Sequence, residues 1–176
     1  MDIQKKMGRG GIRPLEFKTF SKEMQNAITN YCQAGGNFFV SGAYVASDLW
    51  DNRLVKANEE DKKFAMEVLK YKWRVGQAAR NGKVKSVASP FPEITGSYTY
   101  YQDLNPESYV VESPDALEPA AQGAFTILQY SENNLSAGIA YKGNYKTCVL
   151  GFPFEAIRTV TERELLMKAI LTFFEH

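Results

Sequence analysis

The residues best placed for chemistry follow an apolar run in the first third of the chain. Residues 38–40, Phe-Phe-Val, have the pattern of a strand buried on both faces. Residues 41–43, Ser-Gly-Ala, then turn the chain toward another expected helix. Ligands and catalytic groups of α/β proteins collect at such strand-to-helix turns. We therefore expect a ligand-binding pocket at Ser41, Gly42 and Tyr44.

A second candidate is the segment 112–119, Glu-Ser-Pro-Asp-Ala-Leu-Glu-Pro, whose two prolines indicate a loop. Its carboxylates, Glu112, Asp115 and Glu118, could form a cation site or an acid/base pair. Acids and prolines are also common in exposed loops, which is the structural alternative. We expect Glu112 and Asp115 to line the same pocket as Tyr44.

The most informative absence concerns histidine, because the only one in the sequence is the last residue, His176. Ser-His-Asp and Cys-His catalysis need an imidazole that is held in place, and the end of a terminal helix holds it poorly. Without a neighbouring base, the hydroxyl of Ser41 is only a weak candidate for a nucleophile. Cys32 and Cys148 form no Cys-x-x-Cys pair and are expected to be buried free thiols. The sequence predicts no metal site and no cofactor.

Composition limits the partners. The net charge of +1, from 21 basic and 20 acidic residues, argues against nucleic acid or an anionic membrane as the main partner. No apolar run approaches the ~18 residues of a membrane span. The N-terminus lacks the apolar run of a signal peptide, so the compartment stays open; an extracytoplasmic location would require that the chain is a piece of a longer protein. The ten tyrosines suit either sheet packing or a sugar-binding surface.

Periodicity and turn residues predict one α/β domain over residues 1–176, with residues 1–14 as a flexible N-terminal segment. No strand opens the chain, which suggests a fragment of a larger protein. An incomplete sheet edge would favour a homo-oligomer. Three expected helices have N-caps at Ser21, Asn58 and Thr161, the last with Glu164 as its capping-box partner. The helices are expected over 21–34, 59–71 and from 161 onward, and the strands over 83–87, 97–101, 124–130, 136–141 and 145–152.

Two stretches together carry a family resemblance. They are Gly-Gly-Asn-Phe-Phe-Val-Ser-Gly-Ala-Tyr at 35–44 and Val-Leu-Gly-Phe-Pro-Phe-Glu-Ala-Ile at 149–157, followed by Arg163 and a C-terminal helix. The arrangement resembles the class I glutamine amidotransferase-like fold, and most closely the Bacteroides-type proteins labelled xanthan lyases. The likeness runs from about Phe17 to Phe174. It implies a three-layer, flavodoxin-like mixed sheet with an antiparallel hairpin portion.

The same resemblance argues against glutamine hydrolysis. In active amidotransferases the turn after this strand carries a nucleophilic cysteine, and the matching position here is Ser41. The catalytic histidine of the family has no usable counterpart. Many relatives use this fold as a non-catalytic module in larger carbohydrate-active proteins, so carbohydrate or other domains of the parent protein are the implied partners.

Three functions follow. The first is an inactive amidotransferase-like domain that serves binding or assembly. The second is an enzyme acting on acidic polysaccharide, which needs a base and a positive group. The third is a sugar-binding module that uses Trp50, Trp73 or tyrosines as stacking platforms. Asp48 and Asp51 beside Trp50 could bind a sugar or a cation, but solvated helix caps are the favoured interpretation. The residues that could supply the base and the positive group of the enzyme are Tyr44, Tyr98, Tyr100, Tyr109, Arg53 and Arg74. Nothing in their spacing brings them together.

Overall fold

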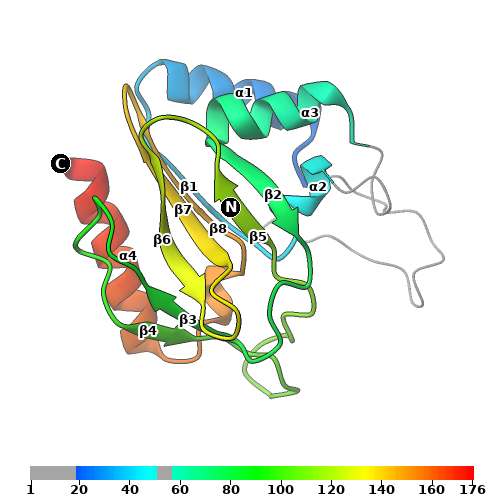
Figure 1. Ribbon diagram of the computed structural model, residues 1–176, viewed down its shortest axis with the longest axis vertical. Coiled ribbons are helices and arrows are strands. Elements are labelled where there is room, and N and C mark those ends of the chain that lie inside the picture. The colour runs from blue at the N-terminus through cyan, green and yellow to red at the C-terminus, as the bar shows by residue number, and fades with distance from the viewer. Residues whose placement is uncertain (1–18, 51–56) are drawn as a thin grey trace.

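The computed structural model describes residues 19–50 and 57–176 of the chain, and everything below refers to these residues (Figure 1). Helices and strands alternate in the first half, and strands predominate in the second. The helical elements are α1 (Lys22–Gln33), α2 (Ser47–Trp50), α3 (Glu59–Phe64), the π-helix Ala65–Leu69, the 3-10 helix Phe154–Ala156 and α4 (Val160–Glu175). The strands are β1 (Phe38–Ser41), β2 (Tyr71–Val75), β3 (Lys83–Ser86), β4 (Ser97–Thr99), β5 (Ala116–Pro119), β6 (Ala124–Tyr130), β7 (Ser136–Lys142) and β8 (Lys146–Leu150).

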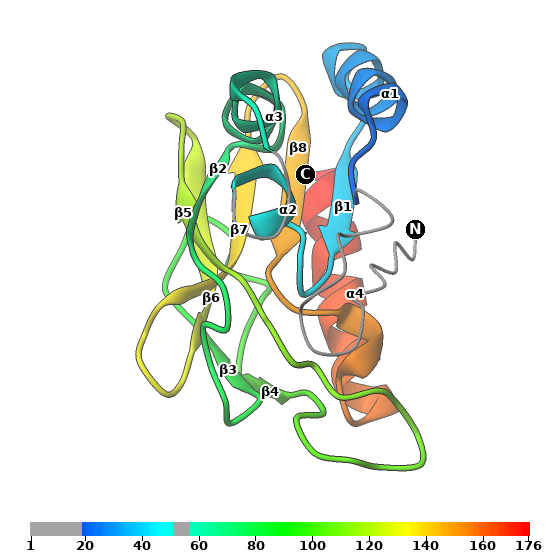
Figure 2. The same cartoon turned by 90° about the vertical axis from the view of Figure 1, so that its right-hand side faces the viewer.

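Six strands form a curled mixed sheet in the order β1-β8-β7-β6-β3-β4 (Figure 2). β1 pairs with β8 in parallel, and the other neighbours in this sheet are antiparallel. β2 and β5 form a separate two-stranded antiparallel sheet. The α/β class and the antiparallel hairpin portion are thus confirmed, whereas the three-layer flavodoxin-like arrangement stays a prediction.

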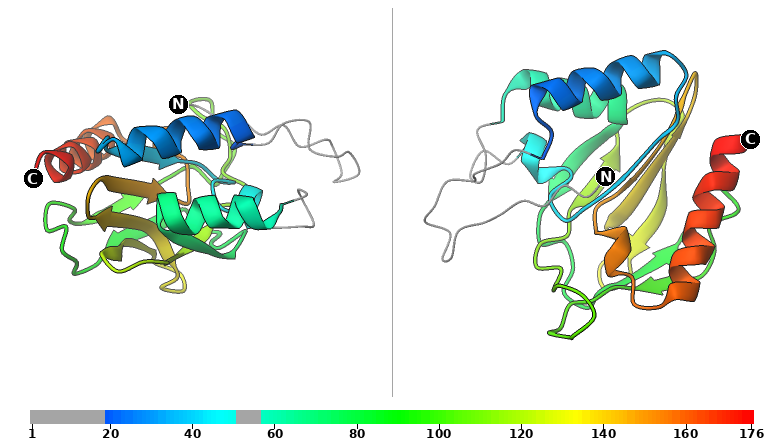
Figure 3. Two further views of the ribbon diagram at one scale, coloured as in Figure 1. Left: turned by 90° about the horizontal axis from the view of Figure 1, so that it is seen from above. Right: turned by 180° about the vertical axis from the view of Figure 1, so that it is seen from behind.

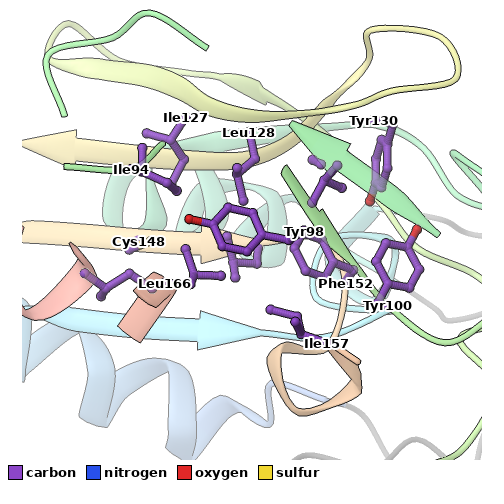
Figure 4. Packing of buried hydrophobic residues seen from close by; sticks show 14 of the residues in the cluster. Ile94, Tyr98, Tyr100, Ile127, Leu128, Tyr130, Cys148, Phe152, Ile157 and Leu166 are labelled. Carbon is purple, nitrogen blue, oxygen red and sulfur yellow. The ribbon is translucent and has the colours of Figure 1, made fainter. Parts of the chain in front are cut away.

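Apolar cores lie on both faces of the six-stranded sheet, because successive side chains of a strand point to opposite faces. In β8, Cys148 and Leu150 belong to the core under α4, whereas Val149 belongs to the core shared with α1, α3 and β2. Figure 4 shows part of the first core, where Tyr100 stacks on Phe152 with ring centroids 5.0 Å apart. Packing on both faces of the sheet thus holds in place the strand ends that carry the candidate site.

Polar contacts hold α1 and α3 side by side on the second face (Figure 3). The buried Gln25 side chain donates to Asp61 Oδ1 at 2.7 Å, and exposed Lys22 pairs with Glu60 at 2.6 Å. Asp61 also forms a capping box with Asn58, which is the N-cap that the sequence predicts. The predicted N-cap of α1 is likewise present, because Ser21 Oγ accepts from Met24 N.

Two predictions about the strands are wrong. β1 was expected to be buried on both faces, but it is an edge strand of the described sheet, and Phe38 and Phe39 are only half-buried. The segment 112–119 was expected to be a loop, but its second half is β5, which pairs with β2 far earlier in the chain. This pairing is non-local, so proline and acid content near residue 115 could not indicate it.

The expected helix 59–71 also ends early. It passes into the π-helix Ala65–Leu69, Lys70 adopts a left-handed conformation with φ 68°, and Tyr71 opens β2. At the C-terminal helix, the capping box is Thr159 with Glu162 rather than Thr161 with Glu164.

Both cysteines are free and buried, as predicted. Burial raises the pKa of the Cys32 thiol to about 11, with a smaller opposing effect from the Lys70 charge. Burial also raises the pKa of Cys148. The predicted N-terminal segment 1–14 lies outside the described residues.

We expect Thr159→Ala to lower the free energy of unfolding by about 1 kcal/mol, because it removes the cap of α4. Thr159 Oγ1 accepts from Glu162 N at 3.1 Å, and the Glu162 carboxylate accepts from Thr159 N at 3.3 Å. Urea denaturation measures the change. The matched control is exposed Thr161→Ala, for which a change within about 0.5 kcal/mol is expected; an equal loss in both variants would contradict the cap assignment.

Candidate functional site

Asp115 is the centre of the candidate site, and its side chain is fully buried just before β5. Its Oδ2 accepts hydrogen bonds from the backbone N–H groups of Ala46 at 2.8 Å and Ser47 at 2.9 Å. Its Oδ1 accepts from the indole Nε1 of Trp73 at 3.1 Å. The carboxylate thus joins the segment after β1, the strand β2 and the start of β5.

The main chain of Asp115 is held as firmly. Its N–H donates to the Gly151 carbonyl at 2.7 Å, and its own carbonyl accepts from the Tyr130 hydroxyl at 2.7 Å. A Cβ on Gly151 would lie 2.0 Å from the Asp115 carbonyl oxygen, so only glycine fits there. The end of β8 and the end of β6 therefore fix the position from which the carboxylate projects.

Burial raises the pKa of Asp115 to about 7, because a charged carboxylate is costly away from water. The N–H donors of Ser47, Ala46 and Trp73 act in the opposite direction, since they favour the ionised form. Burial, and to a smaller extent the charge of Asp115, raises the pKa of the fully buried Tyr71. The Tyr71 hydroxyl donates to the Val45 carbonyl at 2.6 Å.

Tyr44 is half-buried beside this carboxylate. Its pKa is raised by burial first, then by the Glu112 charge and by Asp115, and a hydrogen bond with Ser113 opposes the shift. Two of the residues predicted for the same pocket, Glu112 and Asp115, therefore lie within electrostatic reach of Tyr44. Their role in binding stays a prediction.

Ser41 and Gly42 lie at the junction between β1 and the end of β8. Ser41 Oγ accepts from Phe154 N at 3.1 Å, so the hydroxyl is directed to the 3-10 helix after β8. Gly42 N donates to the Leu150 carbonyl at 3.2 Å and extends the β1–β8 pairing. The two residues thus end the strand, but the Ser41 hydroxyl is engaged away from Asp115.

His176 lies near the opposite end of β1. Asn37, just before this strand, donates through Nδ2 to the Phe174 carbonyl at 3.0 Å, which places the end of α4 there. Ser41 closes the strand, about 13 Å further along at the usual rise of a strand. The single histidine is therefore not placed to activate the Ser41 hydroxyl.

The other residue types considered for an enzyme do not come together. Tyr98 and Tyr100 are buried in the core under α4. Tyr109 donates its hydroxyl to Glu155, and Arg74 pairs with Glu118 at 3.6 Å. Arg53 and Asp51 lie outside the described residues. Of the two stacking candidates, Trp50 is half-buried, and Trp73 has its indole N–H bonded to Asp115.

Sequence reasoning missed two features of the site. No strand is predicted at Trp73, although residues 71–75 alternate with the period of two that is typical of a strand. Asp48 was expected to be a solvated cap, but it is fully buried and its Oδ2 accepts from Phe20 N at 3.1 Å. That contact spans 28 positions, so no local pattern indicates it.

No group of three or more His, Cys, Asp or Glu side chains in residues 19–50 and 57–176 is arranged to hold a metal ion. Within the same ranges, no helix has the length and apolar character needed to cross a membrane.

The comparisons with known proteins concern the fold. Neither a protein family nor a curated protein matches the sequence. Among solved structures, a β-galactosidase from Rahnella sp. R3 matches 88% of this chain with a TM-score of 0.55 and 14% identity. An exo-β-1,4-mannosidase, Op5Man5 from Opitutaceae bacterium strain TAV5, matches 85% with a TM-score of 0.47 and 10% identity. The chain spans about a fifth of either enzyme, 21% and 22% respectively, so the first match shows a shared fold only.

We expect Asp115→Asn to remove a pH dependence of stability between pH 4 and 7. The folded pKa of about 7 lies above the unfolded value of ~3.9, so the folded state binds the proton more tightly. This contribution is fully present below about pH 4 and is lost as the pH rises through 7, by up to about 4 kcal/mol. Urea denaturation of both proteins across this range gives the difference curve; a flat curve would contradict the prediction.

Proposed function

We propose that the chain is a catalytically inactive, glutamine amidotransferase-like α/β module that serves binding or assembly in a carbohydrate-related bacterial protein. The observation that carries the proposal is the state of Ser41, at the position matching the nucleophile of the family. Its hydroxyl accepts from Phe154 N at 3.1 Å, and the only histidine of the sequence follows α4 near the other end of β1. In the part of the chain that the structure describes, no hydrogen bond joins Ser41 to a base that could activate it.

The fold supports the carbohydrate-related part of the proposal. The match to the β-galactosidase covers 88% of this chain but only 21% of the enzyme, as a module within a larger carbohydrate-active protein would. Apolar cores on both faces of the sheet also agree with a three-layer arrangement of the flavodoxin-like kind. Fold likeness alone is an analogy, so the function must be tested on the site itself.

A second candidate is a polysaccharide-acting enzyme of the xanthan lyase type, and one observation favours it. Asp115 has a pKa raised to about 7 and lies beside Tyr44, as an acid/base pair would. Against it, both Asp115 oxygens already accept hydrogen bonds, and the side chain is fully buried. A general base must reach the proton that it removes, so the buried carboxylate fits a structural role better.

We expect the protein to release no ammonia from glutamine and to produce no new chain ends from acidic polysaccharide, and Ser41→Ala to leave both baselines unchanged. The reason is the missing base at Ser41. A coupled ammonia assay and a chain-end assay between pH 5 and 8 measure the two activities. Turnover that disappears in Ser41→Ala would overturn the inactive assignment, and turnover that disappears in Asp115→Asn would favour the second candidate.

The binding part needs its own measurement. Electrophoresis through gels containing an acidic or a neutral polysaccharide should show slower migration of the protein in at least one of them. Equal migration in all gels, relative to a non-binding reference protein, would contradict the carbohydrate-related proposal.

A further inference from the structure

A lysine ammonium group lies over two tyrosine rings beside the β7–β8 hairpin. Figure 1 shows this hairpin at one end of the large sheet. The Nζ atom of Lys70 is 4.9 Å from the ring centre of Tyr141 and 5.5 Å from that of Tyr145. The two rings are 5.2 Å apart and tilted by 58°. All three side chains are half-buried, so the group, called here the Lys70 cluster, reaches the surface.

The backbone is strained to hold this lysine. Lys70 has φ 68°, which non-glycine residues seldom adopt, and it ends a π-helix, which is itself rare. The Tyr145 hydroxyl donates to the carbonyls of Val68 at 2.9 Å and Glu67 at 3.2 Å, both within that π-helix. The π-helix thus positions the Tyr145 ring beside Lys70.

Two glycines accommodate the other ring. A Cβ on Gly143 would lie 2.0 Å from the Tyr141 hydroxyl, and a Cβ on Gly123 would lie 3.3 Å from the Tyr141 ring and 2.8 Å from the Lys142 carbonyl. Gly123 also has φ 85°, where other side chains are strained. Backbone conformation and the nearby Lys142 carbonyl therefore require glycine at position 123, directly beside the half-buried Tyr141 ring.

One cation belongs to the cluster. Lys142 and Lys146 are paired in the β7–β8 register, each one position from a tyrosine of the cluster, so their side chains point to the opposite face of the sheet. Lys146 Nζ donates to the Phe174 carbonyl at 3.1 Å. The carboxylate of Glu67, from the adjoining π-helix, is 3.9 Å from Lys63 and is therefore partly neutralised.

We propose that the Lys70 cluster binds sugar units that carry a carboxylate, such as the uronates of acidic polysaccharides. Aromatic rings offer apolar faces for the C–H groups of a sugar, while Lys70 offers a cation for its carboxylate. An acidic peptide would use the cation but needs no pair of fixed rings. The inference rests on the proposed function, because it names the ligand class and the surface of the binding module.

Calorimetric titration with hexagalacturonate, and with neutral maltohexaose for comparison, tests the proposal. Lys70→Asn removes the charge but keeps a residue that tolerates positive φ, and Tyr141→Leu removes one ring. Each should weaken hexagalacturonate binding about tenfold, because Lys70→Asn removes the charged donor to the carboxylate and Tyr141→Leu removes the ring against the sugar, and contacts of either kind contribute on that order. Matched controls are Tyr109→Leu, an exposed tyrosine beside Glu155 past the other end of β8, and exposed Lys83→Asn on β3. Thermal melting shows that each variant is folded.

Selective loss in Lys70→Asn and Tyr141→Leu, with unchanged controls, would support the proposal. Hexagalacturonate binding that all four variants retain would overturn the site but leave the proposed function standing. Equal binding of maltohexaose would overturn the acidic ligand class. Displacement of hexagalacturonate by an equal concentration of short polyglutamate would overturn the choice of a sugar. Absence of binding to either oligosaccharide would overturn the inference, and the gel assay then decides separately on the proposed function.

Discussion

A carboxylate removed from water must be compensated by hydrogen bonds, and much of this fold is arranged around that requirement at Asp115. Its oxygens accept three N–H groups, from Ala46, Ser47 and Trp73. Ala46 and Ser47 follow β1 of the six-stranded sheet, whereas Trp73 belongs to β2 of the two-stranded sheet. Loss of one donor would leave a buried charge short of a partner, which costs more than an ordinary hydrogen bond contributes. The relative position of the two sheets is thereby coupled to a single side chain.

Buried aspartates that accept hydrogen bonds also lie on the face covered by α1 and α3. Asp48 accepts from the Phe20 backbone, and Asp61 accepts from the Gln25 side chain and completes a helix cap. All three aspartates are buried, and each connects segments that are far apart in the sequence. Buried polar contacts of this kind require defined partners, whereas apolar packing alone tolerates exchange. Each of these aspartates therefore fixes the relative position of two segments of the fold.

The sequence predicts the local elements of this fold and misses the contacts between them. Caps at Ser21 and Asn58, and the hairpin strands near residues 124–150, follow from residue types and turns within a few positions. The shift of the last cap to Thr159 reflects two acceptable Thr-x-x-Glu boxes two residues apart. The residues around Asp115 have the composition of an exposed loop. The hydrogen bond from Trp73, 42 positions earlier, is one of the non-local contacts that surround the buried carboxylate. The Lys70 cluster likewise depends on a π-helix, which no local residue pattern indicates.

The parallel pairing of β1 with β8 has a consequence for how the chain is made. Phe38–Ser41 has its partner in Thr147–Leu150, on the far side of more than half of the sequence. During synthesis, β1 therefore leaves the ribosome long before the strand that covers one of its edges, while the antiparallel strands can form among themselves. The edge carries the apolar run Phe-Phe-Val during that interval. Such a strand is a natural target for a chaperone until β8 emerges and pairs with it.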